Sequence, residues 1–174
     1  MDENVLKIYK YGEDVLQLKA KEVKNIGEEI VRLLYKMTAT MYNTDNGIGL
    51  AAPQVGESLQ VSVIDLSMGT KPDERMILIN PEIIETDGEE TGEEGCLSLP
   101  GISIPVKRKS GLLLRYFDLE GKEHQREFQG FMARAIQHEI DHLQGVLIID
   151  RVSSLKKQMV KKEIKRLKRD GKWN

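Results

Sequence analysis

The sequence lacks several features, and each absence excludes a class of protein. It has no long run of apolar residues, and its first ten residues, MDENVLKIYK, include acidic side chains. We therefore expect neither a secretory signal nor a membrane span. Cys96 is the one cysteine in the sequence, so an internal disulfide is excluded, and a reducing cytoplasm is the expected compartment.

The 174 residues also lack internal repeats, low-complexity tracts and any linker that would separate domains. Because 40% of the residues are hydrophobic and 31% are charged, the chain can bury a real core, and we expect residues 1–174 to form one domain. The formal net charge of −2 conceals an acidic run at 89–94 and a basic segment from Arg151 onward. Charge runs of this kind are usually solvated faces.

Hydrophobic spacing predicts both helices and strands. Helical spacing occurs at 28–42 and again from about Ser154 to 170, where the expected inward residues are Leu155, Met159, Ile164 and Leu167. Strand-forming residues gather at 61–66, 76–79, 112–117 and 124–128, the last two as a hairpin through Glu120 and Gly121. Because the strands cluster ahead of the late helices, the pattern predicts an α+β fold.

Two of the three histidines lie four residues apart in QHEIDHLQG, residues 137–145. On a helix, positions i and i+4 share one face, so His138 and His142 can aim their imidazoles at one metal ion. Glu139 can then reach water near that ion, and Gly145 is placed to end the helix. The alternative is a pair of solvated histidines on an exposed helix face.

A third ligand is needed to choose between these interpretations. His124 lies in a polar strand and is expected to be exposed, whereas Cys96 lies in EGCLSLP, where Gly95 allows another group to approach and Pro100 is expected to end any regular strand. The alternative for Cys96 is a small buried hydrophobic residue. A thiolate and two imidazoles would leave one tetrahedral position open, as a catalytic site requires. Glu139 would then move protons during hydrolysis of an amide.

Hydrolysis of an amide also needs hydrogen-bond donors for the oxyanion that forms. The small-residue segment GIGLAAPQ, residues 47–54, offers backbone N–H groups and the amide of Gln54. It lacks the GKS/T ending of a phosphate-binding loop. The alternative is a tight turn in which Gln54 faces water.

Three segments together resemble the peptide deformylase family. The family signatures GxGLAAxQ, EGCLS and QHExDHLxG match residues 47–54, 94–98 and 137–145, in the same order and with similar spacing. The resemblance covers essentially the whole chain. It implies antiparallel or mixed sheets packed around a central metal-binding helix, with further helices near the N- and C-termini.

The resemblance also implies a role for each matched residue. The metal ligands would be Cys96, His138 and His142. Glu139 would be the general acid and base, and Gln54 with the backbone N–H of Leu97 would stabilise the oxyanion. The reaction would be hydrolysis of the N-formyl group from the initiator formyl-methionine of nascent polypeptides, which releases formate.

The family commonly uses Fe(II), and zinc, nickel or cobalt can occupy such a site, whereas the ligands alone suggest zinc. The resemblance further implies an apolar pocket for the methionine side chain and an extended peptide that pairs near Ile48 and Gly49, with Gly95 close by. Some relatives carry an arginine near the pocket where this chain has Ser103 or its neighbours. Arg134 and Ala135 lie where pocket-lining residues are expected, so substrate preference beyond formyl-methionine stays open.

Two other classes share part of this pattern. A zincin-like endopeptidase would also carry HExxH, and a non-catalytic metal-stabilised binding module would use the same ligands.

For the basic residues after Ser154, the plain interpretation is a solvated helix face. The family resemblance offers a second, in which this helix docks on ribosomal RNA near the nascent-chain exit. Neither a membrane nor DNA is expected as a partner.

Overall fold

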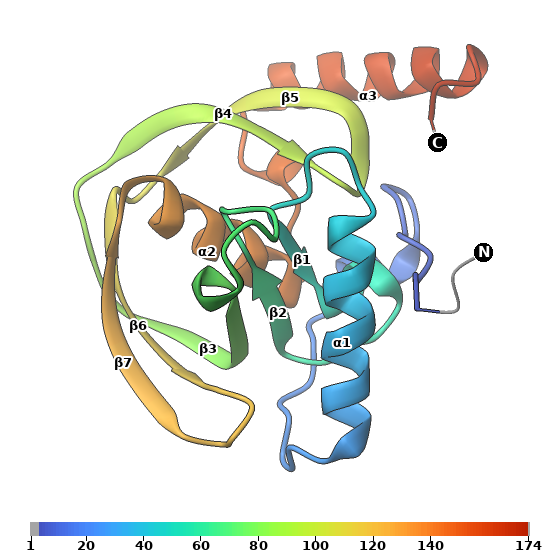
Figure 1. Ribbon diagram of the computed structural model, residues 1–174. Helices are drawn as coiled ribbons and strands as arrows, with labels where there is room; N and C mark the ends of the chain where they lie inside the picture. The colour runs from blue at the N-terminus through green and yellow to red at the C-terminus, as the bar shows by residue number, and fades with distance from the viewer. Residues whose placement is uncertain (1–3, 174) are drawn as a thin grey trace.

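The computed structural model describes residues 4–173 and has an α+β fold, as predicted (Figure 1). Within these residues the helices are α1 (Glu28–Tyr42), α2 (Gly130–Leu143) and α3 (Ser154–Arg169). The strands are β1 (Gly49–Ala51), β2 (Val61–Ile64), β3 (Met76–Asp87), β4 (Glu90–Cys96), β5 (Leu99–Arg108), β6 (Gly111–Phe117) and β7 (Glu123–Gln129). An antiparallel sheet has the order β1-β2-β3-β6-β7, and β4 pairs with β5 in a second sheet. No helix in the described part of the chain is long and apolar enough to cross a membrane.

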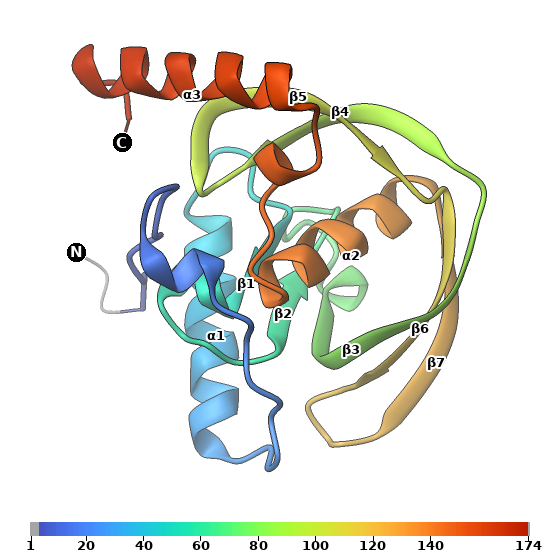
Figure 2. The same cartoon turned by 180° about the vertical axis from the view of Figure 1, so that it is seen from behind.

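Helix α2 lies at the centre of the molecule, inside the curve of β3, β6 and β7 and beneath β4 and β5 (Figures 1 and 2). The helix stops where the sequence predicted, because Gly145 adopts a φ of 72°, a left-handed conformation that favours glycine. A Cβ atom at Gly145 would lie 2.5 Å from the backbone oxygen of Gln17. Nearby, Ala20 N–H donates to the carbonyl of Leu143 at 2.8 Å. The end of α2 is therefore held against the N-terminal segment.

Several predicted elements are confirmed. Helix α1 has the predicted bounds, and its residues Leu34, Met37 and Met41 are buried in an apolar cluster with residues of β1 and β2. Strands β6 and β7 form the predicted antiparallel hairpin. Strand β3 is much longer than the predicted 76–79, and most of its second half is exposed. The prediction covered only the more buried first part of the strand.

The hairpin of β4 and β5 was not predicted. The expectation that Pro100 ends regular structure is wrong, since Pro100 lies within β5. A missing N–H group is tolerated there because β5 pairs with β4 only, on one side. The acidic run at 89–94 is only partly a solvated face: Glu93 is exposed, but the next residue, Glu94, is buried.

Helix α3 begins at the predicted residue, where the Ser153 side chain accepts a hydrogen bond from Lys156 N–H. The predicted inward face is wrong for Leu155 and Met159, which are 71% and 56% exposed. The prediction is confirmed for Ile164, which is buried in a cluster with apolar residues of β5, and Leu167 packs against that cluster. Val160, which was not predicted to face inward, is buried there as well. The helix lies across β5 (Figures 1 and 2), so only a narrow stripe of its surface faces the core.

Candidate metal centre

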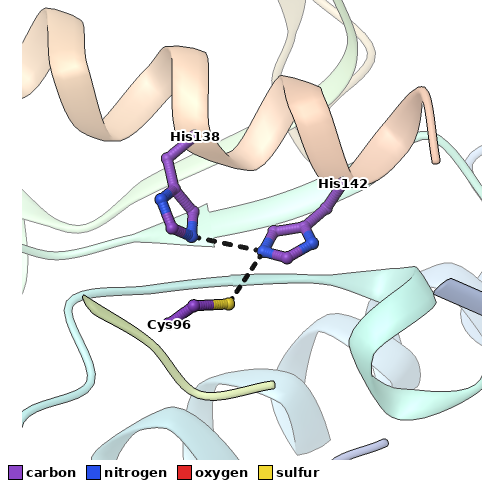
Figure 3. A group of neighbouring side chains, drawn as sticks. All are labelled: Cys96, His138 and His142. Atoms are coloured by element: carbon purple, nitrogen blue, oxygen red, sulfur yellow. Dashed lines mark hydrogen bonds between the residues drawn. The ribbon is translucent and has the colours of Figure 1, made fainter. Parts of the chain in front are cut away.

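The side chains of Cys96, His138 and His142 converge at the centre of the molecule. Cys96 ends β4, and the two histidines lie one turn apart on α2. His142 Nε2 lies 3.4 Å from Cys96 Sγ and 3.2 Å from His138 Nε2. Figure 3 shows the thiol and both imidazoles pointing toward one another, and one donor atom from each lies within 4.8 Å of the others. The structure therefore brings together the three predicted ligands.

The spacing of these atoms fits a transition-metal ion. In a tetrahedral site with metal–sulfur bonds of about 2.3 Å and metal–nitrogen bonds of about 2.0 Å, ligand atoms lie about 3.3–3.6 Å apart. The separations of 3.4 and 3.2 Å are close to that range. Thiolate and imidazole suit zinc, iron and neighbouring metals rather than magnesium or calcium. Three protein ligands also leave a coordination position for a reactant.

A buried carboxylate orients the first histidine. His138 Nδ1 donates to Glu94 Oε2 at 3.0 Å, which directs the Nε2 lone pair toward Cys96 and His142. Burial opposes ionisation of Glu94, but hydrogen bonds from Arg108 and His138 lower the pKa of Glu94 to about 2. Glu94 is therefore a permanent negative charge behind the metal ligand.

The two histidines differ in their electrostatic surroundings. Burial lowers the pKa of His142 well below its usual range, so this imidazole is neutral, as a metal ligand must be. For His138, burial acts in the same direction, but hydrogen bonds with Cys96 and Glu94 raise its pKa well above the usual range. The surroundings of His138 thus favour positive charge. Because a proton and a metal ion compete for one lone pair, the same surroundings favour a bound cation.

Glu139 follows His138 on α2 and packs closely against Gly49 of β1. It is buried, and its Oε2 makes no hydrogen bond within the described residues. A Cβ atom at Gly49 would collide with Glu139 Oε1, so the glycine of β1 makes space for this carboxylate. Burial, with the negative charges of Glu94 and Asp141, raises the pKa of Glu139 to about 7, against the opposing effect of His138 and Arg108. A carboxyl group with that pKa can both accept and donate a proton near neutral pH.

The amide of Gln54 is held in one orientation. Gln54 is almost fully buried, and its Oε1 accepts a hydrogen bond from Ala51 N–H at 2.9 Å. Its Nε2 therefore points the other way, 3.3 Å from Ser98 Oγ and 3.7 Å from Cys96 Sγ. The alternative in which Gln54 faces water is wrong. Leu97, which follows Cys96 in the chain, lies in the turn between β4 and β5, and its side chain packs on the apolar cluster of α1.

A cavity of about 1120 Å³ adjoins this centre, and Cys96, His138 and Glu139 all line it. The three predicted substrate-binding residues, Ile48, Gly49 and Gly95, line it as well. Strand β1 is at the edge of the large sheet, and β4 pairs only with β5, so each strand has one edge without a partner strand in the described residues. An extended peptide can add to edges of this kind through backbone hydrogen bonds.

The other positions singled out in the sequence have distinct surroundings. Arg134 and Ala135 line the cavity, as expected, but Arg134 is buried. Ser103 Oγ donates to Glu93 Oε2 at 2.9 Å on the exposed side of the hairpin. The expectation that His124 is exposed is wrong: it is half-buried, stacks on Tyr116 and lies 2.5 Å from Asp118. His124 is not part of the metal-ligand group, and its side chain is held by Asp118 and Tyr116.

A buried network of charged residues was missed by the sequence analysis. Arg108 donates to both oxygens of Glu94 at 2.9 Å and to Asp141 at 2.5 Å. Arg151 also donates to Asp141, at 2.9 Å through Nε. The signal that could have found Glu94 and Arg108 is strand alternation, since Glu94 shares a face with Cys96, and Arg108 shares one with Ile104 and Val106.

The sequence matches the family model described as polypeptide deformylase over residues 5–158. It is 46% identical over 161 residues to a peptide deformylase of Thermodesulfovibrio yellowstonii, a match that covers 92% of this chain and 97% of that protein. The solved structure of a peptide deformylase from Legionella pneumophila is similar with a TM-score of 0.89 and 39% identity, covering 95% of this chain and 96% of that one. The structure of a peptide deformylase from Synechococcus elongatus in complex with actinonin has a TM-score of 0.87 and 40% identity, covering 98% of this chain and 90% of that one.

The convergence of three ligands predicts the effect of removing each one. Cys96→Ala, His138→Ala and His142→Ala should each leave two ligands, so the purified proteins should contain far less than one metal ion per chain. Elemental analysis after anaerobic purification measures this ratio. His124→Ala is the matched control and should keep its metal. A full complement of metal in Cys96→Ala would contradict the ligand assignment.

Proposed function

The chain belongs to the peptide deformylase family and is a peptide deformylase, and from this premise we propose which residues carry the reaction. The enzyme hydrolyses the formyl amide of a formylated peptide, so that the C–N bond breaks and formate and a free amine are released. Membership of this family sets aside the endopeptidase and the binding module that the HExxH pattern also allowed. The observation that carries the assignment of roles is the buried carboxylate of Glu139 beside the Cys96, His138 and His142 group.

Cys96, His138 and His142 would hold one divalent ion. When bound, the ion supplies Lewis-acid chemistry, which lowers the pKa of water and polarises a carbonyl oxygen. We propose Fe(II) as the native ion, following the family, with zinc, nickel or cobalt able to take its place. A thiolate with two imidazoles accepts all of these ions, so availability decides among them.

Glu139 is the general base and then the general acid. Its carboxylate takes a proton from the attacking water and later gives it to the amine nitrogen as the C–N bond breaks. Its burial and its pKa of about 7 support both steps at neutral pH. Gly49 is in close contact with one side of the Glu139 carboxylate. We propose that the acyl site next to this carboxylate admits the hydrogen of a formyl group but not the methyl group of an acetyl group.

Gln54 Nε2 and the backbone N–H of Leu97 donate to the oxyanion that forms on the formyl carbon. The Gln54 amide needs no rearrangement for this role, because Ala51 N–H already fixes its orientation. Both donors lie next to Cys96: Leu97 follows it in the chain, and Gln54 Nε2 lies 3.7 Å from its Sγ. Preorganised donors of this kind act on the transition state rather than on the bound substrate.

The substrate is the N-terminal end of a nascent polypeptide that begins with formyl-methionine. We infer that its backbone extends between the free edges of β1 and β4, near Ile48, Gly49 and Gly95. Phe131 and Ala135 line the same cavity and offer an apolar surface to the methionine side chain. We also infer that residues 1–174 act as one catalytic domain in the cytoplasm, where nascent chains are made.

The proposed roles predict a sharp substrate preference and a specific defect. The protein should release formate from formyl-Met-Ala-Ser and leave acetyl-Met-Ala-Ser and casein intact. Glu139→Gln should keep one metal ion per chain but lose about 10²–10⁴ in turnover, because Gln preserves the shape of Glu and cannot accept a proton. Formate assays with metal analysis on the same samples measure both effects. Unchanged turnover in Glu139→Gln would remove Glu139 from the mechanism.

The oxyanion donor predicts a second defect. Gln54→Ala should lower turnover by about 10²–10³ while metal content is unchanged. Because Gln54 also accepts a hydrogen bond from Ala51, the alanine variant loses a structural contact as well. Gln54→Glu keeps an acceptor for Ala51 and removes the donor, so it should show a comparable loss. A loss smaller than about threefold in both variants would leave Gln54 with a structural role only.

We further propose that α3 docks on ribosomal RNA near the nascent-chain exit. The outward side of α3 is basic, and Lys161, Lys162 and Lys165 are all exposed there. Three other cations of the helix region, Lys157, Arg166 and Arg169, instead pair with carboxylates within the protein. Exposed lysines near phosphates release counterions, which makes such binding steeply salt-dependent.

This proposal is tested better by charge reversal than by removing α3, because Val160 and Ile164 are buried and their loss would open the core. Lys161→Glu, Lys162→Glu and Lys165→Glu combined should weaken low-salt co-sedimentation with bacterial ribosomes by at least about tenfold and leave turnover on short peptides unchanged. The matched control combines Lys19→Glu, Lys21→Glu and Lys24→Glu, which are also exposed and change the charge equally. Equal binding by the two triple variants, or none by the wild type, would leave α3 as a solvated helix.

A further inference from the structure

Arg134 is a buried arginine whose two terminal nitrogens donate to carboxylate and carbonyl oxygens of β4 and β5. It lies on α2 one turn before His138, and its side chain is only 5% exposed. Its Nη1 donates to Glu94 Oε1 at 2.7 Å and to the carbonyl of Val106 at 2.9 Å. Its Nη2 donates to the carbonyl and the carboxylate of Glu90, both at 3.2 Å. Although Arg134 lines the cavity, these partners occupy both terminal nitrogens, so its role is toward the protein rather than toward an anionic substrate.

The guanidinium group fits because position 92 has no side chain. A Cβ atom at Gly92 would lie 3.1 Å from Arg134 Cζ, closer than ordinary van der Waals contact. The backbone of Gly92 does not adopt a left-handed conformation, since its φ is not positive. A side chain at position 92 would therefore press on the guanidinium group of Arg134, which would have to shift by a few tenths of an ångström.

Arg134 completes the hydrogen bonds of Glu94. Glu94 Oε1 accepts from Arg134 and from Arg108 Nε, and Glu94 Oε2 accepts from Arg108 Nη2 and from His138 Nδ1. Arg108 also donates to Asp141, so its charge is shared between two carboxylates. Arg134 supplies a second cation and holds the oxygen that does not face the histidine. With Oε1 fixed in this way, the carboxylate cannot turn and Oε2 stays aimed at His138.

We infer that Arg134, in the space that Gly92 leaves, is a positioning residue that fixes Glu94 and thereby holds His138 with its Nε2 toward the metal ion. Arg134 and His138 are at positions i and i+4 of α2, so they reach the two oxygens of one carboxylate from the same helix face. This inference rests on the proposed ligation of the ion by His138. It assigns no contact between Arg134 and the substrate.

The test measures metal affinity and ligand geometry instead of activity. Arg134→Met keeps a long unbranched side chain but removes every donor, and it should weaken zinc binding by about 10–100-fold in competition with a chelator. The visible spectrum of the cobalt(II) form should change as well, since it reports the arrangement of the ligands. Arg151→Met is the matched control: it removes an arginine that holds α2 through Asp141 but does not touch Glu94. The control should bind zinc within about threefold of the wild type.

Gly92→Ala keeps the test decisive if Arg134→Met folds poorly. The added Cβ should displace Arg134 and weaken zinc binding by more than about threefold, and the same change should have no further effect when Arg134 is already methionine. All variants are compared at a temperature at which circular dichroism shows them folded. Wild-type affinity in both Arg134→Met and Gly92→Ala, or an equal effect of Gly92→Ala in the two backgrounds, would overturn the inference.

His138→Ala separates this inference from the function on which it rests. Loss of metal in His138→Ala together with wild-type affinity in Arg134→Met would overturn the role of Arg134 alone. Full metal content in His138→Ala would overturn the ligand assignment itself and the role of Arg134 with it.

Discussion

The carboxylate of Glu94 accepts hydrogen bonds from two arginines and a histidine while its side chain is only 5% exposed. The metal ligands come from two elements, Cys96 from β4 and the two histidines from α2, and these elements are in contact at this carboxylate. Cys96 follows Glu94 by two residues on β4, so both side chains point to the same face, and His138 reaches Glu94 from α2. Because one anion touches both elements, the distance between the thiol and the imidazoles depends on it. Glu94 thus couples the position of β4 to that of α2.

Holding several charges away from water is costly, at several kcal/mol for each ion before pairing. The network offsets this cost by alternating its signs: Glu94 lies between Arg108 and Arg134, and Asp141 lies between Arg108 and Arg151. The low pKa of Glu94 shows that the arginine and histidine contacts outweigh the effect of burial. Apolar residues could fill the same volume with equal or greater stability. They could not accept a hydrogen bond from His138 Nδ1, so the network is explained by the orientation of the ligand rather than by stability.

The sequence allowed the ligands and the helices to be predicted, because those signals are local. The i, i+4 histidine pair and the stop at Gly145 can be seen within one short segment, and the amphipathic period of α1 is regular. The hairpin of β4 and β5 escaped prediction because its strands contain Pro100, several glycines and an acidic run. Whether Glu94 faces water or the core is decided by Arg108 and Arg134, which are distant in sequence. The prediction that Leu155 and Met159 face inward failed for the same reason, since β5 determines which side of α3 is covered.

The pair of β4 and β5 has two strands only, and such a ribbon is marginal by itself. It docks on the molecule through Glu94 on one strand and through the apolar residues of β5, which pack against Val160 and Ile164 of α3. An ion that bridges Cys96 to α2 would close a chain segment of about forty residues, and a ligand that binds only the folded form adds its binding free energy to folding. A bound metal ion, the carboxylate of Glu94 and the inner face of α3 would therefore all hold the hairpin of β4 and β5 against the rest of the molecule. The exposed lysines on the outer face of α3 do not contact this hairpin, so a partner could bind them without disturbing the metal centre.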